Sequence, residues 1–178
     1  NMTKYIKMTV SSNFGNIFSL LFASIFLPFL PMAPIHLIVL NLVYDLSCIA
    51  LPFDRVDKDF LKKPRIWEAK SITRFMAWFG PISSVFDILT FILLYFVIVP
   101  MITGYGYVHG ADSAGLFFML FQTGWFIESM WSQTMVIYML RSPKLPFVQS
   151  RPAFAVMATT LLGALLVTFL PYGPLAYL

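Results

Sequence analysis

The sequence carries little charge for its length. Charged residues make up 11% of the 178 residues, hydrophobic residues make up 59%, and the mean hydropathy is +0.80. Soluble domains contain about 25% charged residues. These proportions exclude an ordinary soluble domain and favour a protein whose solvent is the lipid bilayer.

Residues suited to catalysis are also scarce. The one cysteine, Cys48, excludes an internal disulfide and a metal site built from paired thiolates, and we expect it to be a small packing residue. The sequence has no glycine-rich phosphate loop, no Ser/His/Asp arrangement and no Cys/His cluster. We therefore expect neither a catalytic residue nor a nucleotide-binding site in this chain.

The net charge of +4 does not indicate nucleic-acid binding, because the basic residues are confined to three short blocks between apolar runs. Lys4 and Lys7 form the first block, seven residues within 55–74 form the second, and three residues within 141–151 form the third. If the apolar runs cross a membrane, every basic residue falls on one side. The positive-inside rule assigns that side to the cytoplasm.

Five apolar stretches are long enough to span a bilayer, which requires about 20 residues of helix. They lie at about 8–27, 33–52, 75–100, 114–140 and 153–170. The first two are joined by PFLPMAP, whose prolines exclude one continuous helix and predict a tight hairpin. The sequence predicts an all-α, polytopic transmembrane helix bundle of five spans, with a short basic cytoplasmic loop after the second.

Three acidic residues, Asp45, Asp87 and Glu128, fall inside the predicted spans. An ionisable group in hydrocarbon is costly, so such residues ordinarily face the bundle interior or an ion path. Asp45 requires a cation, a proton or a basic partner, and no lysine or arginine lies within a span. For Asp87 and Glu128, a ligand role and a structural hydrogen bond are both open.

Two pairs of polar residues are spaced to share a helix face. Asn41 precedes Asp45 by one turn on the second span, and Asn13 precedes Asn16 by one turn on the first. We expect the hairpin to make these spans antiparallel neighbours, so that the pairs face each other as an oxygen-lined cation site. Asparagines in membrane helices also hydrogen-bond across helices without any ligand, which is the alternative reading.

These residues carry a resemblance to a known family. YIKMTVSSNFGNIFSLL and PIHLIVLNLVYDLSCIALPFD resemble the fifth and sixth transmembrane helices of P-type cation-transporting ATPases. GWFIESMWSQTMVIYMLRSPKLPF resembles the eighth helix and its exit loop, so the resemblance covers nearly all of residues 1–178 as helices five to nine. It implies a C-terminal transmembrane domain with cation ligands at Asn13, Asn16, Asn41, Tyr44 and Asp45, and Glu128 is a further candidate ligand.

These segments most resemble the bacterial magnesium-transporting members of that family. Calcium pumps have glutamate where this chain has Asn16 and threonine where it has Tyr44, which argues against a two-calcium site. Mg²⁺ is usually held by one or two carboxylates and retained waters, which suits Asp45, neutral amides and Glu128. The same architecture carrying Ca²⁺ or another cation is the first alternative. A non-enzymatic channel or membrane scaffold is the second.

The resemblance also implies that this chain is the cation-binding and support part of a longer, multi-pass protein of the inner (plasma) membrane. The first residues, NMTKYIKMTV, lack an initiator methionine and the layout of a signal peptide, so we expect the chain to begin within that protein. Its upstream actuator, phosphorylation and nucleotide domains would bind ATP with Mg²⁺, and further transmembrane helices would complete the bundle. We expect the second span to unwind locally at NLVYD.

Overall fold

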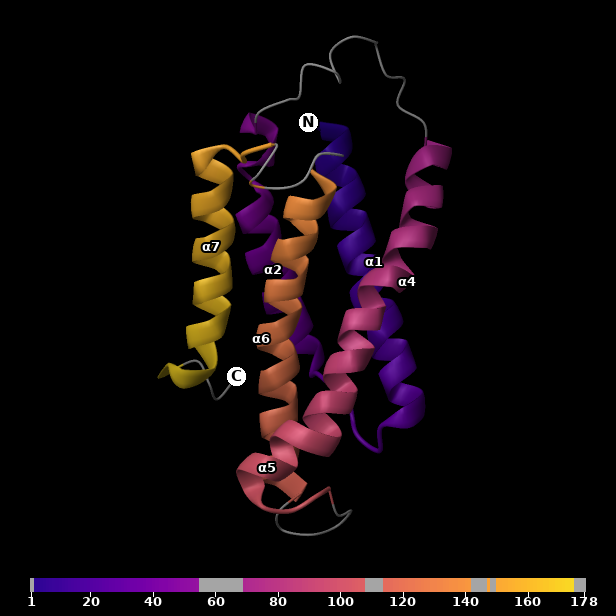
Figure 1. Ribbon diagram of the computed structural model, residues 1–178, viewed down its shortest axis with the longest axis vertical. Helices are drawn as coiled ribbons and strands as arrows, with labels where there is room; N and C mark the ends of the chain where they lie inside the picture. Colours follow the sequence, from indigo (N-terminus) through magenta and orange to yellow (C-terminus); the bar gives the residue numbers. More distant parts are fainter. Residues whose placement is uncertain (1, 55–68, 108–113, 142–146, 148–149, 175–178) are drawn as a thin grey trace.

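The helices of the chain run along one common axis (Figure 1). The computed structural model describes residues 2–54, 69–107, 114–141, 147 and 150–174. Helices account for nearly all of these residues, and no strand occurs among them. Most of the predicted basic loop, residues 55–68, lies outside the described part.

The helices follow the predicted spans in order. The first hairpin consists of α1 (Met2–Phe26) and α2 (Pro34–Cys48), and a short 3₁₀ turn η1 (Leu51–Phe53) follows α2. The third span consists of three consecutive helical segments, and each of the last two spans is a separate helix. These are α4 (Ala69–Leu93), the π-helix η2 (Leu94–Ile98), α5 (Val99–Thr103), α6 (Ala114–Leu140) and α7 (Phe154–Phe169) with the 3₁₀ turn η3 (Leu170–Tyr172).

Four helical stretches are long and apolar enough to cross a membrane, namely Tyr5–Phe26, Pro34–Phe53, Ile72–Thr103 and Phe154–Tyr172. The remaining helix, α6, has 27 residues and extends about 40 Å, which exceeds the roughly 30 Å hydrocarbon core of a bilayer. It carries a band of polar residues and occupies the middle of the bundle, where it contacts α1, α2, α4 and α7. The prediction of an all-α bundle with membrane-spanning helices is confirmed.

One local prediction is wrong. The segment NLVYD is not unwound, because α2 remains a regular α-helix from Pro34 to Cys48. The irregular backbone is instead the π-helix η2 in the third span, directly before Pro100. Proline donates no hydrogen bond to the carbonyl four residues earlier, and its ring pushes against that carbonyl, so the preceding turn widens. Gly124 of α6 leaves room for this stretch, since a Cβ there would overlap the side chain of Leu94.

The arrangement of the hairpin also differs from the prediction. Helix α1 runs along α4, whereas α2 runs along α7, and α6 lies between these two pairs and contacts all four helices. Consequently α1 and α2 touch over only a short stretch and are not packed face to face. In Figure 1, α1 and α4 begin at the upper end of the bundle, and α2 and α6 end there. The described basic residues that belong to this end are Lys7, Lys70, Arg74, Arg141 and Arg151.

The hairpin loop between α1 and α2 is anchored at the other end of the bundle. The ring of Phe29 packs among a group of aromatic rings from η2, α6 and the segment after α5, with centroid distances of 5.1 to 6.5 Å. These rings belong to Tyr95, Tyr107, Phe117, Phe118 and Phe121. The side-chain amide of Gln122 donates a 3.1 Å hydrogen bond to the Leu30 carbonyl. The loop is therefore fixed by α6 as well as by its prolines.

The closest approach of α7 to its neighbours generates a test of the packing. A Cβ at Gly163 would overlap Ser47 Oγ of α2 and would lie 3.0 Å from the Met130 side chain of α6. We expect Gly163→Ala to destabilise the protein by about 1–3 kcal/mol, as overpacking does elsewhere. Thermal unfolding in detergent measures this loss.

Two further variants control that experiment. Gly115→Ala has open space around the new methyl group, so its melting temperature should match that of the wild type. Adding Ser47→Ala to Gly163→Ala removes the overlapping hydroxyl and should restore part of the stability. If Gly163→Ala melted like Gly115→Ala, the close packing of α7 on α2 would be wrong.

Candidate cation-binding site

A stripe of small polar residues runs along the buried face of α1. Ser11, Ser12, Asn16 and Ser19 are all buried, and they recur at the three- and four-residue spacing that places side chains on one helix face. A membrane helix satisfies its backbone internally, so these side chains must find partners on neighbouring helices or leave polar atoms unpaired. The stripe points toward α4 and α6, where its partners lie.

Three side-chain amides from three helices form a chain across the bundle. Gln133 of α6 donates from Nε2 to Asn16 Oδ1 of α1 at 2.9 Å. Asn16 in turn donates from Nδ2 to Asn41 Oδ1 of α2 at 3.4 Å. The expectation that Asn16 and Asn41 lie together is confirmed, although the amide from α6 was not expected to join them.

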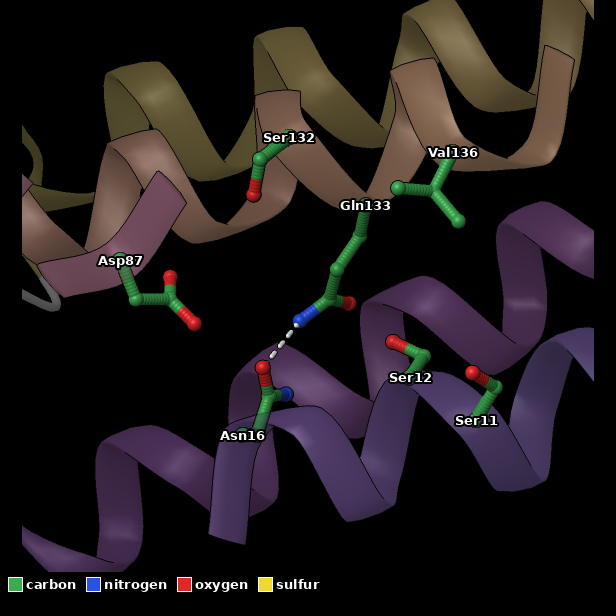
Figure 2. A pocket seen from close by; sticks show the side chains of 7 residues that line it. All are labelled: Ser11, Ser12, Asn16, Asp87, Ser132, Gln133 and Val136. Carbon is green, nitrogen blue, oxygen red and sulfur yellow. Dashed lines mark hydrogen bonds between the residues drawn. The ribbon is translucent and has the colours of Figure 1, made fainter. Parts of the chain in front are cut away.

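A small polar cavity opens beside this chain, with a volume of about 20 Å³. Figure 2 shows that its walls come from α1, α4 and α6 and that the Asp87 carboxylate and the Gln133 amide both point into it. The lining residues are Ser11, Ser12, Asn16, Asp87, Ser132, Gln133 and Val136. This volume suffices for one water molecule or one ion that has shed most of its waters.

Several oxygen atoms around the cavity lack partners. Ser12 Oγ and Gln133 Oε1 are buried and have no hydrogen-bond partner among the described residues. An unpaired buried acceptor costs free energy, so a native protein ordinarily supplies a water, a proton or a cation to it. The cavity thus combines open oxygen acceptors with one carboxylate.

Tyr44 and Asp45 occupy two neighbouring positions on α2. The Tyr44 side chain is fully buried and its hydroxyl lies near Ser12 and Cys48. Asp45 is only partly buried as a residue, yet its Oδ1 is buried and has no partner in the described structure. Asn13 is likewise half-buried at the edge of the α1 stripe. These three residues border the amide chain and do not line the cavity.

Asp87 ties three helices together. Its Oδ2 accepts a 2.5 Å hydrogen bond from the Ser19 hydroxyl of α1, and its Oδ1 accepts a 3.1 Å hydrogen bond from the Trp125 indole of α6. Both oxygens therefore already have donors, which indicates a structural role. Of the two readings left open for Asp87, the structure thus supports the structural hydrogen bond, with its donors on other helices.

Glu128 lies within reach of Asp87, and its Oε2 is buried without a hydrogen-bond partner. No lysine or arginine forms an ion pair with either acid in the part of the chain that the structure describes. The described residues also contain no cluster of three or more His, Cys, Asp or Glu side chains able to hold a metal. A cation here would consequently be bound mostly by neutral oxygens.

Sequence reasoning did not assign Gln133 and Ser132 to the site. A signal was present, because Glu128 and Ser132, and likewise Ser129 and Gln133, are spaced by one turn and form a polar band on an otherwise apolar helix. The spacing does not indicate which neighbouring helix this band faces.

Comparison with known proteins identifies the family. The family model described as cation transporting ATPase, C-terminus, matches residues 29–177. The chain is 50% identical over 175 residues to the magnesium-transporting ATPase, P-type 1, of Salmonella typhimurium LT2, covering 98% of this chain. It is 47% identical over 176 residues to the protein of that name from Escherichia coli K12, covering 99% of this chain.

A more distant relative is the calcium-transporting ATPase of Bacillus subtilis 168, which is 36% identical over 101 residues and covers 53% of this chain and 11% of that protein. The chain spans only 18% of the length of each magnesium-transporting relative. Most of each relative therefore has no counterpart in this sequence.

The donors around Asp87 generate a test of its structural role. Asp87→Ala leaves the Ser19 hydroxyl and the Trp125 indole unpaired, and we expect a loss of about 0.6–2 kcal/mol for each hydrogen bond. Asp87→Asn keeps one acceptor oxygen and should lose less. Unfolding of the intact protein in detergent, followed by tryptophan fluorescence, measures both. A fully stable Asp87→Ala protein that had lost its response to cations would instead make Asp87 a ligand.

Proposed function

This chain belongs to the cation-transporting ATPases as part of their C-terminal membrane region, and we propose that it holds the transported ion of a Mg²⁺ pump. The observation that carries the proposal is the chain of amides from Gln133 through Asn16 to Asn41, with unpaired buried oxygens on either side. Such a group of oxygens is suited to a hard divalent cation.

The proposed ligands lie where α1, α2 and α6 meet. Asn16 and Asn41 offer amide oxygens, and Asp45 offers the unpaired carboxylate oxygen that supplies negative charge. Asn13 and Tyr44 border this group, while Glu128 contributes from the α6 side. Binding a cation would require the amide hydrogen bonds to rearrange, because their oxygens now accept hydrogens.

The ion identity rests on chemistry and on similarity. Mg²⁺ gives up its waters reluctantly and is usually bound through one or two carboxylates, whereas Ca²⁺ takes six to eight oxygens at longer distances. The local supply of one carboxylate on α2 and of neutral amides favours the ion that needs fewer carboxylates. Both long matches are to proteins named for magnesium transport.

In the intact protein we place the bundle end that carries the basic residues in the cytoplasm of a bacterial cell, with the chain in the inner membrane. The domains that bind ATP with Mg²⁺ and accept its phosphoryl group would belong to the remainder of the protein. Helix α1 begins six residues before its predicted start at Met8, at that end of the bundle, so it is suited to relay their movement to Asn16. Transport would be directed inward.

A Ca²⁺ pump is the second candidate, and the specific observation in its favour is the match to the calcium-transporting ATPase of Bacillus subtilis. That match covers half of this chain at lower identity. A channel or scaffold without ATPase activity has no comparable support among the relatives.

The proposal is tested in proteoliposomes, which separate Mg²⁺ as the transported ion from Mg²⁺ as the counter-ion of ATP. The intact protein is oriented with its nucleotide domains outside, MgATP is held constant outside, and the luminal concentration of Mg²⁺ or Ca²⁺ is varied. We expect luminal Mg²⁺ to stimulate ATP hydrolysis. In Asp45→Asn the half-maximal Mg²⁺ concentration should rise about tenfold or more, since contacts to charged groups contribute about 1.5–3 kcal/mol.

The matched control is Ser24→Ala, which removes an exposed α1 hydroxyl that donates a hydrogen bond to the main-chain carbonyl of Leu20 in the same helix. Its Mg²⁺ dependence should equal that of the wild type. Stimulation by Ca²⁺ and not by Mg²⁺ would establish the second candidate. An unchanged Mg²⁺ dependence in Asp45→Asn would remove Asp45 from the site.

A further inference from the structure

Arg141, the first residue after α6, is buried although arginine at a membrane boundary ordinarily reaches water. Its side chain is 1% exposed. The guanidinium donates from Nε to Asp54 Oδ2 at 2.9 Å and from a terminal nitrogen to Asp54 Oδ1 at 3.4 Å. It also donates to the main-chain carbonyls of Ser150 and Arg151 at 2.9 and 3.2 Å. The position of Arg141 at the end of a span does not by itself require these hydrogen bonds.

Asp54 is the other half of the pair and is equally enclosed, with its side chain 3% exposed. It follows the 3₁₀ turn at the end of α2. Besides Arg141, its Oδ1 accepts a 2.9 Å hydrogen bond from the main-chain N–H of Ala153, the N-cap residue directly before α7. The ion pair therefore joins the ends of α2 and α6 to the start of α7.

Stability alone explains such a pair poorly. Removing two charges from water costs several kcal/mol per ion, and apolar replacements of similar shape are often as stable. The fork of a guanidinium against a carboxylate does, however, fix direction and distance more strictly than apolar contacts do. Its expected contribution is to the relative position of the helices that it joins.

Those helices carry the proposed ligands. Gln133 lies on α6 about 12 Å, slightly more than two turns, before Arg141. Asn41 and Asp45 lie on α2, which is rigid up to Cys48. Because α1 and α2 touch only briefly, the position of Asn41 relative to Asn16 depends on how α2 is held against α6 and α7.

We propose that the ion pair of Arg141 and Asp54 is a positioning element that sets α2 against α6 and thereby holds Asn41 and Asp45 at the spacing that binds the cation. This inference rests on the proposed function. It concerns residues that touch neither the cation nor the polar cavity, and it applies to any divalent cation that the site accepts.

The test uses the proteoliposome assay with two mild variants. Asp54→Asn preserves the shape and the acceptor for Ala153 but removes the charge, and Arg141→Lys preserves the charge but removes the fork. We expect each to raise the half-maximal luminal Mg²⁺ concentration about fivefold or more, the usual size of coupling between linked sites. The maximal rate at saturating cation should stay within about twofold of the wild type.

Tyr138→Phe is the matched control. It removes the 2.5 Å hydrogen bond between Tyr138 and Thr160, which joins α6 to α7 near the same end without touching α2. This variant should keep the wild-type half-maximal concentration even if it melts at a lower temperature. An equal shift in Tyr138→Phe would reduce the ion pair to general support and overturn the proposal.

A fall in maximal rate without a shift in half-maximal concentration would also overturn it. If one of the two variants fails to fold, the other variant tests the proposal. The cation concentration that half-maximally stabilises the protein against heat without ATP gives the same midpoint independently of turnover. If luminal Ca²⁺ stimulates the wild type in place of Mg²⁺, the proposed ion is wrong and the same comparison is made with Ca²⁺. If no divalent cation stimulates or stabilises the wild type, both proposals are wrong.

Discussion

Every polar side chain within these helices must be satisfied inside the protein, because the bilayer offers no hydrogen bonds. Helix α6 meets this requirement for most of the bundle. Along its length Trp125 bonds α4, Gln133 bonds α1, and Arg141 directly after it bonds the end of α2. Without these side chains, Asp87 would keep only the Ser19 donor and Asp54 only the main-chain N–H of Ala153, so the arrangement of the other helices depends on the polarity of α6 and of Arg141 after it.

The same requirement separates supporting residues from ligand candidates. Asp87 has a donor on each carboxylate oxygen, and the charge of Asp54 is neutralised by a guanidinium, so both are explained by the protein alone. Asp45, Glu128 and Gln133 each retain a buried oxygen with no partner among the described residues. These three open oxygens, contributed by α2 and α6, are the ones that the proposed cation would pair with.

Much of this architecture is predictable from the sequence, because span length and hydropathy are local properties. The site is predictable only in part. The spacing of Asn41 and Asp45 places them on one face of α2, but their distance from α1 depends on the intervening α6, which no local pattern reveals. The ion pair of Arg141 with Asp54 was missed for that reason, since both residues read as ordinary boundary charges. The π-helix before Pro100 shows the reverse case, because Pro100 was a local signal in the sequence and no irregular backbone was predicted there.

The central claim is that the cation binds where α1, α2 and α6 meet, and not at Asp87 of α4. Anomalous diffraction from crystals of the intact protein with Mn²⁺ in place of Mg²⁺ tests it most directly. The account predicts one peak within about 2.0–2.2 Å of oxygens from Asn16, Asn41 and Asp45. A peak held by Asp87 and lacking any ligand from α2 would contradict it.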